Sequence, residues 1–160
     1  MLHIFPLNDV AEAQFRALFT QYYAELDCED EPEHLLSEYV LPDLKAGLIS
    51  VEMLKDGEDY AGFIIYQRDE IDNDWNFREG WGDIREIFVI PEKRRQGLGR
   101  FLLYTAEMKL KESGAQKAYA LPVDEAEPFF RACGYSAGDC YSEELDCAVY
   151  EKLNLNNKCK

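Results

Sequence analysis

The chemistry suggested by this chain is concentrated in residues 84–103, where an apolar strand leads through a basic turn into a helix. The first N–H groups of a helix have no partner within it, and together with the helix dipole they can bind phosphate groups. Gly97 and Gly99 remove side chains that would keep an anion away from this backbone. Further positive charge comes from three arginines of the same turn: Arg94, Arg95 and Arg100. The segment therefore predicts a site for a phosphate or pyrophosphate.

The charge distribution favours this interpretation over a helix start that merely happens to be basic. The 160 residues include 17 Lys and Arg against 32 Asp and Glu, which gives a net charge of −15. Residues 93–117 nevertheless carry a net +5, and the rest of the chain carries −20. The overall acidity argues against nucleic acid or an anionic membrane surface as a partner.

The turn has neither the GxxxxGK[ST] pattern of a P-loop nor the third glycine of a dinucleotide-binding fingerprint. It resembles the acyl-CoA motif of the GNAT superfamily of N-acyltransferases, [QR]xxGx[GA], which reads RRQGLG at residues 94–99. A strand and a proline precede it at 89–91, as in the family. Residues 123–135 resemble a second family motif, NxxAxx[FL]YxxxG[FY]. Val123 and Phe130 replace its asparagine and tyrosine, whereas four positions match: Ala126, Phe129, Gly134 and Tyr135.

The resemblance implies an acetyltransferase that uses acetyl-CoA (coenzyme A) as cosubstrate and no metal. Its pantetheine arm would pair with the backbone of three strand residues: Ile87, Phe88 and Val89. Its pyrophosphate would lie on the turn formed by Arg94, Arg95, Gln96, Gly97, Leu98, Gly99 and Arg100. A neutral primary amine would attack the thioester directly within one ternary complex, so the resemblance implies no catalytic cysteine.

This reaction needs a base for the amine, a donor for the developing oxyanion and a proton for the departing thiolate. The family pattern implies the Val89 amide as the oxyanion donor. Glu86 and Asp83 are the candidates for the base, and strict alternation places them on opposite faces unless a bulge intervenes. Glu86 could instead serve only as an ion-pair partner of Arg85 or of lysines.

The proton donor for the thiolate stays open, because Phe130 stands where many family members have a tyrosine. Four other tyrosines are near in sequence, and nothing selects one of them: Tyr104, Tyr119, Tyr135 and Tyr141. Missing polar groups at positions 123 and 130 also leave room for a non-catalytic acyl-CoA sensor or interaction module of the same fold. An unrelated α/β domain with another phosphate ligand is a third hypothesis.

Three acidic segments could line the acceptor side: residues 25–33, the stretch with Trp75 and Trp81, and the loop 138–146. Their charge suits a cationic amine, either a small molecule or a peptide, and a tryptophan could add a cation–π contact. Loops are usually polar, however, and exposed tryptophans often mark a dimer surface, so the acceptor and the choice between monomer and homodimer stay open.

The elements that must position these residues follow from hydrophobic periodicity. Strands are predicted at 2–5, 48–54, 60–67, 83–90, 117–121, 135–137 and 147–153. A helix capped by Asn8 or Asp9 runs to about residue 25, and a second helix is kinked or ended by Pro42. Two more helices are predicted at about 97–113 and 125–133.

This order predicts an α/β (α+β) fold: one GNAT-like domain over residues 1–160, with a single mixed, mostly antiparallel sheet. By the resemblance, its central parallel strands are splayed and helices flank the sheet. The five cysteines form no CxxC pair, and no apolar run approaches 18 residues. We therefore expect a cytoplasmic protein with free thiols, no metal and no membrane partner.

Overall fold

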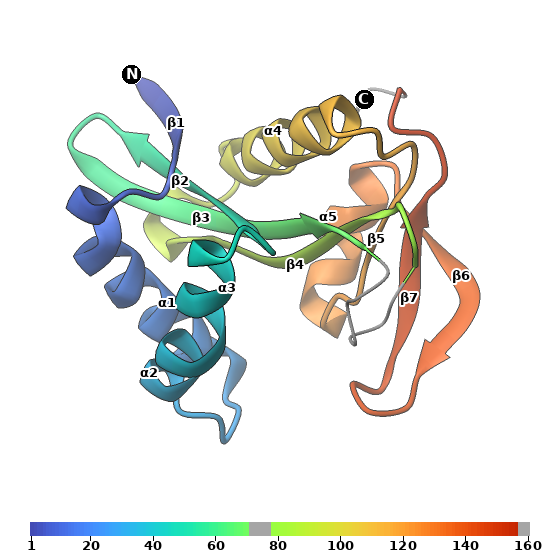
Figure 1. Ribbon diagram of the computed structural model, residues 1–160, viewed down its shortest axis with the longest axis horizontal. Helices are drawn as coiled ribbons and strands as arrows, with labels where there is room; N and C mark the ends of the chain where they lie inside the picture. Colours follow the sequence, from blue (N-terminus) through green and yellow to red (C-terminus); the bar gives the residue numbers. More distant parts are fainter. Residues whose placement is uncertain (71–77, 157–160) are drawn as a thin grey trace. The chain divides into compact units, whose positions relative to one another are not determined.

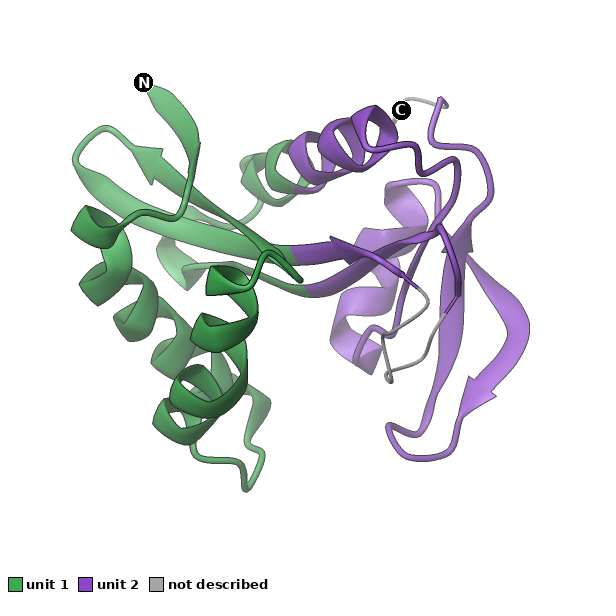
Figure 2. Cartoon of the chain, in the orientation of Figure 1, with its two compact units in different colours: residues 1–65, 86–102 green, residues 66–85, 103–160 purple. Residues whose placement is uncertain are grey.

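A computed structural model describes residues 1–70 and 78–156 (Figure 1). The chain divides into two compact units, residues 1–65 with 86–102 and residues 66–85 with 103–160 (Figure 2). Two strands and one helix, β3, β4 and α4, run from one unit into the other. The single domain over residues 1–160 stays a prediction.

Unit 1 contains the N-terminal strand and helices, a strand hairpin and the basic turn. Its elements are β1 (Leu2–Pro6), η1 (Asp9–Ala11), α1 (Glu12–Leu26), α2 (Pro32–Leu35), η2 (Leu36–Val40), α3 (Leu41–Lys45), β2 (Ser50–Asp56), most of β3 (Asp59–Arg68), the end of β4 (Gly82–Val89), η3 (Pro91–Lys93) and the start of α4 (Leu98–Glu112).

The predicted N-terminal cap is present: the Asn8 side chain accepts a hydrogen bond from the Ala11 amide at 3.0 Å. Helix α1 ends at Leu26 and is followed by Asp27, whose φ of 50° is left-handed. The β2–β3 hairpin turns at Gly57, where a φ of 63° favours glycine. These local signals set the bounds of the elements that carry the site.

Pro42, predicted to kink or end the second helix, does not end the helical segment, which continues to Lys45. A π-helical turn covers Leu36–Val40, and the Leu41 amide donates to the carbonyl of Leu36, five residues back. A new α-helix then begins at Leu41, so Pro42 lies in its first turn, where a residue needs no N–H donor within the helix.

The core of unit 1 lies between α1–α3 and one face of β2, β3 and β4 (Figure 1). Its members are ten buried apolar residues: Phe15, Leu18, Phe19, Leu36, Ile49, Val51, Met53, Phe63, Ile65 and Phe88. The green start of α4 lies on the opposite side of these strands (Figure 2), and its Leu98 and Leu102 are buried. Both faces of the strands that lead to the basic turn are therefore covered within this unit.

The strands follow the order β1-β2-β3-β4-β5-β7-β6 in one seven-stranded sheet. Pairing is antiparallel for β1 with β2, and parallel for β4 with the three-residue β5 (Ala118–Ala120). The parallel register runs from Gly82↔Ala118 to Ile84↔Ala120, so Arg85–Val89 extend past its last pair. The predicted mixed, mostly antiparallel sheet with flanking helices is confirmed.

Unit 2 contains β5, η4 (Asp124–Ala126), α5 (Glu127–Ala132), β6 (Ser136–Ser142) and β7 (Cys147–Lys152), together with the rest of α4. Within it, buried Lys152 donates to both carboxylate oxygens of Glu107, at 3.0 and 3.2 Å. The Tyr135 hydroxyl also donates to Glu107, at 2.8 Å. These hydrogen bonds compensate both charges for the loss of water.

The expected acidic loop 138–146 is largely a hairpin, since β6 extends to Ser142 and pairs with β7. The sequence of 136–142 gave no strand signal, because none of these seven residues is buried on either face of the sheet. Among the described residues, none of the helices combines the length and the apolar character that a membrane span requires.

Candidate functional site

The basic turn connects the end of β4 to α4 through two residues with left-handed backbone. Arg95 has a φ of 63° and Gly97 a φ of 84°. An added Cβ at Gly97 would meet nothing within 4 Å, so this position favours glycine through its backbone conformation rather than through lack of space. Such closely spaced left-handed residues turn successive N–H groups toward one side, which creates a concavity suited to an anion.

The start of α4 adds further donors to this turn. The Phe101 amide donates to the Gly97 carbonyl at 3.1 Å, which closes the first helical turn. The amides of Leu98 and Gly99 lie before that bond, at the end of a 15-residue helix whose dipole attracts negative charge. The side chain of Leu98 is buried and fixes the helix start. The donor set therefore fits a phosphate or pyrophosphate.

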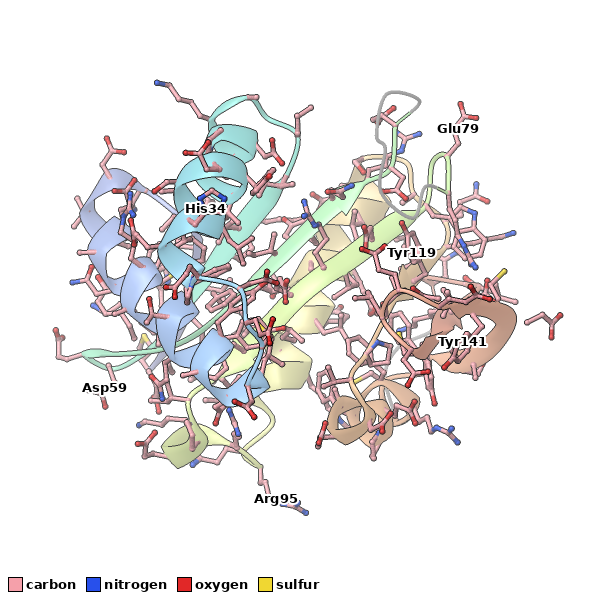
Figure 3. The ribbon with its side chains drawn as sticks, turned by 90° about the horizontal axis from the view of Figure 1, so that it is seen from below. His34, Asp59, Glu79, Arg95, Tyr119 and Tyr141 are labelled. Carbon is pink, nitrogen blue, oxygen red and sulfur yellow. The ribbon has the colours of Figure 1, made fainter. Side chains whose placement is uncertain are left out.

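The arginines that the sequence analysis grouped together have different surroundings in the structure. Arg94 donates from Nε to the Val89 carbonyl at 2.8 Å and from Nη2 to Glu25 at 2.5 Å. Its guanidinium lies 5.5 Å from the Phe88 ring centroid. Arg95 is exposed and extends outward from the turn (Figure 3). Arg94 thus ties the turn to β4 and α1, whereas Arg95 presents its charge to solvent. Gln96 and Arg100 are exposed as well.

A neighbouring lysine ties the same turn to the β2–β3 hairpin. Lys93 lies 2.9 Å from Asp56 and 3.6 Å from Asp59. The hydrogen bond to Asp56 raises the pKa of Lys93 and lowers the pKa of Asp56. Two of the basic residues at the turn, Lys93 and Arg94, therefore hold its backbone in place.

The strand residues expected to pair with the pantetheine arm lie where β4 departs from regular geometry. A Cβ at Gly62 of β3 would be only 2.3 Å from the Phe88 carbonyl oxygen. Because side chains stand perpendicular to a sheet, this carbonyl is turned out of the sheet plane. The Ile90 amide then donates to the Ala61 carbonyl at 2.9 Å. Such an irregularity resembles the bulge that the sequence analysis allowed for in this strand.

Glu86 lies against the C-terminal part of α1. It is half-buried and accepts hydrogen bonds from two consecutive tyrosines: the Tyr22 hydroxyl donates to Oε2, and the Tyr23 hydroxyl donates to Oε1 at 3.2 Å. Burial raises the pKa of both phenols, and the charge of Glu86 raises it further. Arg85, the suggested ion-pair partner of Glu86, donates instead to Gln67 at 3.1 Å.

Asp83, the second candidate base, belongs to unit 2 and lies in a buried polar cluster. The Tyr119 hydroxyl donates to Asp69 at 2.5 Å, and Asp69 also accepts from Gln67 at 3.0 Å. Burial raises the pKa of Tyr119, with further contributions from Asp83 and Asp69. The structure does not bring the two candidate bases together within one unit.

Tyr22 and Tyr23 contact a candidate base, Glu86, and sequence reasoning did not identify them. Tyr22 follows the apolar spacing of α1, which marks it as a core residue, and 64 residues separate it from Glu86. The only available signal was two adjacent phenols at the end of an amphipathic helix. No local rule connects them with a carboxylate on a distant strand.

The position of the family tyrosine offers no hydroxyl. Phe130 is buried, with its ring 5.3 Å from that of Tyr135. Of the tyrosines near it in sequence, Tyr135 donates to Glu107 and Tyr141 donates to Asp146. The described contacts therefore select none of them as the thiolate acid.

The acidic segments have partners of their own. In the segment 25–33, Glu25 pairs with Arg94, and Glu33 accepts a hydrogen bond from Arg16. The Trp81 ring already has two cations near its face, Arg78 at 4.8 Å and Lys117 at 5.1 Å. Trp75 lies outside the described residues.

Comparisons with known proteins agree with this fold. An acetyltransferase from Staphylococcus aureus Mu50, of the GNAT family, is 18% identical, with a TM-score of 0.74 over 97% of this chain and 99% of that chain. The PaiA N-acetyltransferase of Thermoplasma acidophilum, solved in complex with coenzyme A, is 15% identical (TM-score 0.71; 96% and 99% covered). A GNAT family acetyltransferase of Brucella melitensis, solved with acetyl-CoA, is 17% identical (TM-score 0.64; 94% and 95% covered).

Sequence comparison adds the family itself. No curated protein matches this chain. The family model for the acetyltransferase (GNAT) family matches residues 11–135, which include α1, the basic turn and the segment around Phe130. The match covers more than half of the chain and both segments that carry the resemblance, so this protein belongs to the acetyltransferase (GNAT) family.

Proposed function

We propose that this protein transfers an acetyl group from acetyl-CoA to a primary amine by direct attack within a ternary complex. The observation that carries the proposal is the basic turn, where left-handed Arg95 and Gly97 lead into the N-terminus of α4. Membership of the GNAT family and the coenzyme A complexes of two similar structures support it.

In this proposal the turn binds the pyrophosphate of acetyl-CoA through the amides of residues 95–100. Exposed Arg95 and Arg100 add charge, and Arg94 contributes by holding the turn against Val89 and Glu25. The backbone of Ile87, Phe88 and Val89 pairs with the pantetheine arm. The out-of-plane Phe88 carbonyl supports this assignment, because an irregular strand leaves backbone groups available outside the ladder.

Glu86 is the proposed base and takes a proton from the substrate ammonium. The neutral nitrogen then attacks the thioester carbonyl, the new C–N bond forms, and the C–S bond breaks. The Val89 amide is the proposed donor to the oxyanion, and the departing thiolate takes the second proton, which the attacking nitrogen gives up as the amide forms. Asp83 is the less favoured base, since it lies in the buried cluster with Tyr119 and Asp69.

The proposed acceptor is a cationic amine, either a small molecule or a peptide. A net charge of −20 outside residues 93–117 supports it, because an acidic surface attracts protonated amines. We also propose that the protein is cytoplasmic, acts as a monomer or homodimer, and has neither a nucleic acid nor a membrane as a partner.

One observation favours a second candidate, a non-catalytic module of the same fold that binds acyl-CoA as a sensor. Buried Phe130 packs against Tyr135 and supplies no proton at the position where many relatives have a tyrosine. Coenzyme A thiolate is a tolerable leaving group, so we place catalysis first.

Two measurements on the full chain test these proposals. Acetyl-CoA should raise the melting temperature, and thiol release from acetyl-CoA should depend on an amine from a panel of polyamines, aminoglycosides and lysine-rich peptides. R95E should weaken cofactor binding, whereas K45E, with the same charge change on exposed Lys45 of α3, should not. No stabilisation at millimolar acetyl-CoA would overturn the proposal, and saturable binding without thiol release would favour the sensor.

A further inference from the structure

Two consecutive phenols contact the carboxylate proposed as the base. Tyr22 donates to Oε2 of Glu86 and Tyr23 donates to Oε1, so each carboxylate oxygen accepts its own hydrogen bond. We propose that Tyr22 and Tyr23 are positioning residues that fix the Glu86 carboxylate for the acyl transfer. This inference rests on the proposed function and adds a role for α1 within it.

The geometry of a helix makes this arrangement restrictive. Consecutive residues diverge by about 100° around a helix axis, so their side chains do not normally face the same group. Here the two phenols nevertheless reach one carboxylate from different directions. The terminal torsion of a glutamate is otherwise broad, and a rotation of this carboxylate would lengthen at least one of the two hydrogen bonds.

The tyrosine rings are themselves held in place. The Tyr22 ring lies 5.6 Å from Phe88 and 5.9 Å from Phe63, and the Tyr23 ring lies 4.7 Å from Phe19. The end of α1 is tied to the basic turn by the Glu25–Arg94 pair. Burial raises the pKa of both phenols, so they remain protonated donors at neutral pH. The donors therefore have fixed positions from which to orient Glu86.

Of the two candidate bases, α1 contacts only Glu86 in the described hydrogen bonds. The pair approaches Glu86 from the same unit that carries the basic turn, whereas Asp83 lies with Tyr119 and Asp69 in the other. Removing a phenolic hydroxyl should leave the rings in the core while freeing the carboxylate to rotate. Substitution of tyrosine by phenylalanine therefore separates the positioning role from packing.

The test compares Y22F, Y23F and the double variant in the wild-type and E86Q backgrounds, by amine-dependent thiol release. Each single substitution should lower kcat about tenfold, because a hydrogen bond to a charged group is lost. The KM for acetyl-CoA should change by less than about twofold, since the hydroxyls lie outside the proposed pyrophosphate site. In the E86Q background the same substitutions should cause little further loss. Y39F is the control, because Tyr39 of η2 is half exposed.

Each outcome has a defined meaning. Wild-type kcat in Y22F/Y23F would overturn the positioning role, and so would equal losses of kcat with and without Glu86, since tyrosines that act through Glu86 cannot act in its absence. Wild-type protein that releases no thiol with any amine would overturn the proposed function and this role together. Normal turnover by the wild type with unaltered tyrosine variants would overturn only the role, so the two failures are distinguishable.

Discussion

The Nε atom of Arg94 donates to the main-chain oxygen of Val89 at 2.8 Å, which binds the first arginine of the basic turn to the end of the strand before it. The same side chain reaches Glu25 on α1 at 2.5 Å. One arginine thus connects the strand end, the basic turn and the helix that carries Tyr22 and Tyr23. Arg95, the next residue, extends outward from the turn, and in the proposed function it acts as surface charge (Figure 3).

From this difference we predict that R94A mainly lowers the stability of the fold, whereas R95A mainly weakens acetyl-CoA binding. R94A should lower the free energy of unfolding by about 1–3 kcal/mol, because Val89 and Glu25 lose a charged donor. R95A should change it by no more than about 0.5 kcal/mol, yet weaken acetyl-CoA binding through the lost charge. Urea unfolding and cofactor titration measure the two effects. Equal loss of stability in both variants would contradict the role of Arg94 in holding the basic turn against Val89 and Glu25.

The backbone of Arg95 gives a second prediction. At a φ of 63°, a residue other than glycine carries a conformational penalty of about 1 kcal/mol. R95G should therefore be more stable than R95A by roughly that amount, offset in part by the greater freedom of glycine in the unfolded chain. Both variants lack the charge, so their affinities for acetyl-CoA should agree within about twofold. Unequal affinity would show that the backbone conformation, rather than the charge alone, controls binding.

The strand, basic turn and helix of the site could be predicted from sequence because their signals are local. Apolar alternation, a proline and two glycines mark the boundaries of β4 and α4 to within a residue or two. The roles of the arginines could not be predicted in the same way. Arg94 and Arg95 are chemically identical neighbours, and their roles differ through the left-handed backbone of Arg95 and the contact of Arg94 with Glu25, which lies 69 residues away in sequence.

The contact of Glu86 with Tyr22 and Tyr23 could not be predicted from the sequence for the same reason. It joins residues 63 and 64 positions apart, and their side-chain directions depend on how α1 packs on β3 and β4. Pro42 shows that a local sequence rule can also mispredict where a helix ends. Its effect on a helix depends on the hydrogen-bond pattern before it, and a π-helical turn moves it into a tolerated position. Periodicity carries no information about that pattern.

Gly62 gives a prediction about the shape of β4. In G62A the new methyl group would lie 2.3 Å from the Phe88 oxygen, a backbone atom that cannot move without shifting the strand. We expect a loss of about 1–3 kcal/mol in the free energy of unfolding and a raised KM for acetyl-CoA, since residues 87–89 are proposed to pair with it. Denaturant unfolding and steady-state kinetics measure both.

The control for Gly62 is G47A in unit 1. Gly47 has a φ of 77° with nothing within 4 Å of an added Cβ, so alanine there causes backbone strain without a clash. It should cost about 1 kcal/mol and leave the KM unchanged. If G62A kept wild-type stability and KM, the Phe88 carbonyl would not occupy the out-of-plane position described here.

The buried phenols give a prediction about alkaline pH. The pKa values of Tyr22, Tyr23 and Tyr119 are raised, first by burial and then by nearby carboxylates. Above pH 10, where unfolded phenols titrate, the folded protein therefore holds more protons than the unfolded chain. Their stabilising contribution is complete below pH 10 and is lost as the pH rises, by at most about 1.4 kcal/mol per pH unit for each phenol. Urea unfolding between pH 9 and 11 measures this slope.

Spectroscopic titration at alkaline pH assigns the effect to residues. Tyr22, Tyr23 and Tyr119 should resist ionisation until the protein unfolds. In E86Q, loss of the nearby negative charge should let Tyr22 and Tyr23 ionise at lower pH, while Tyr119 keeps its behaviour because Asp83 and Asp69 remain. A titration curve of E86Q identical to that of the wild type would show that Glu86 does not contact the two phenols, and the positioning of the carboxylate by α1 would fall with it.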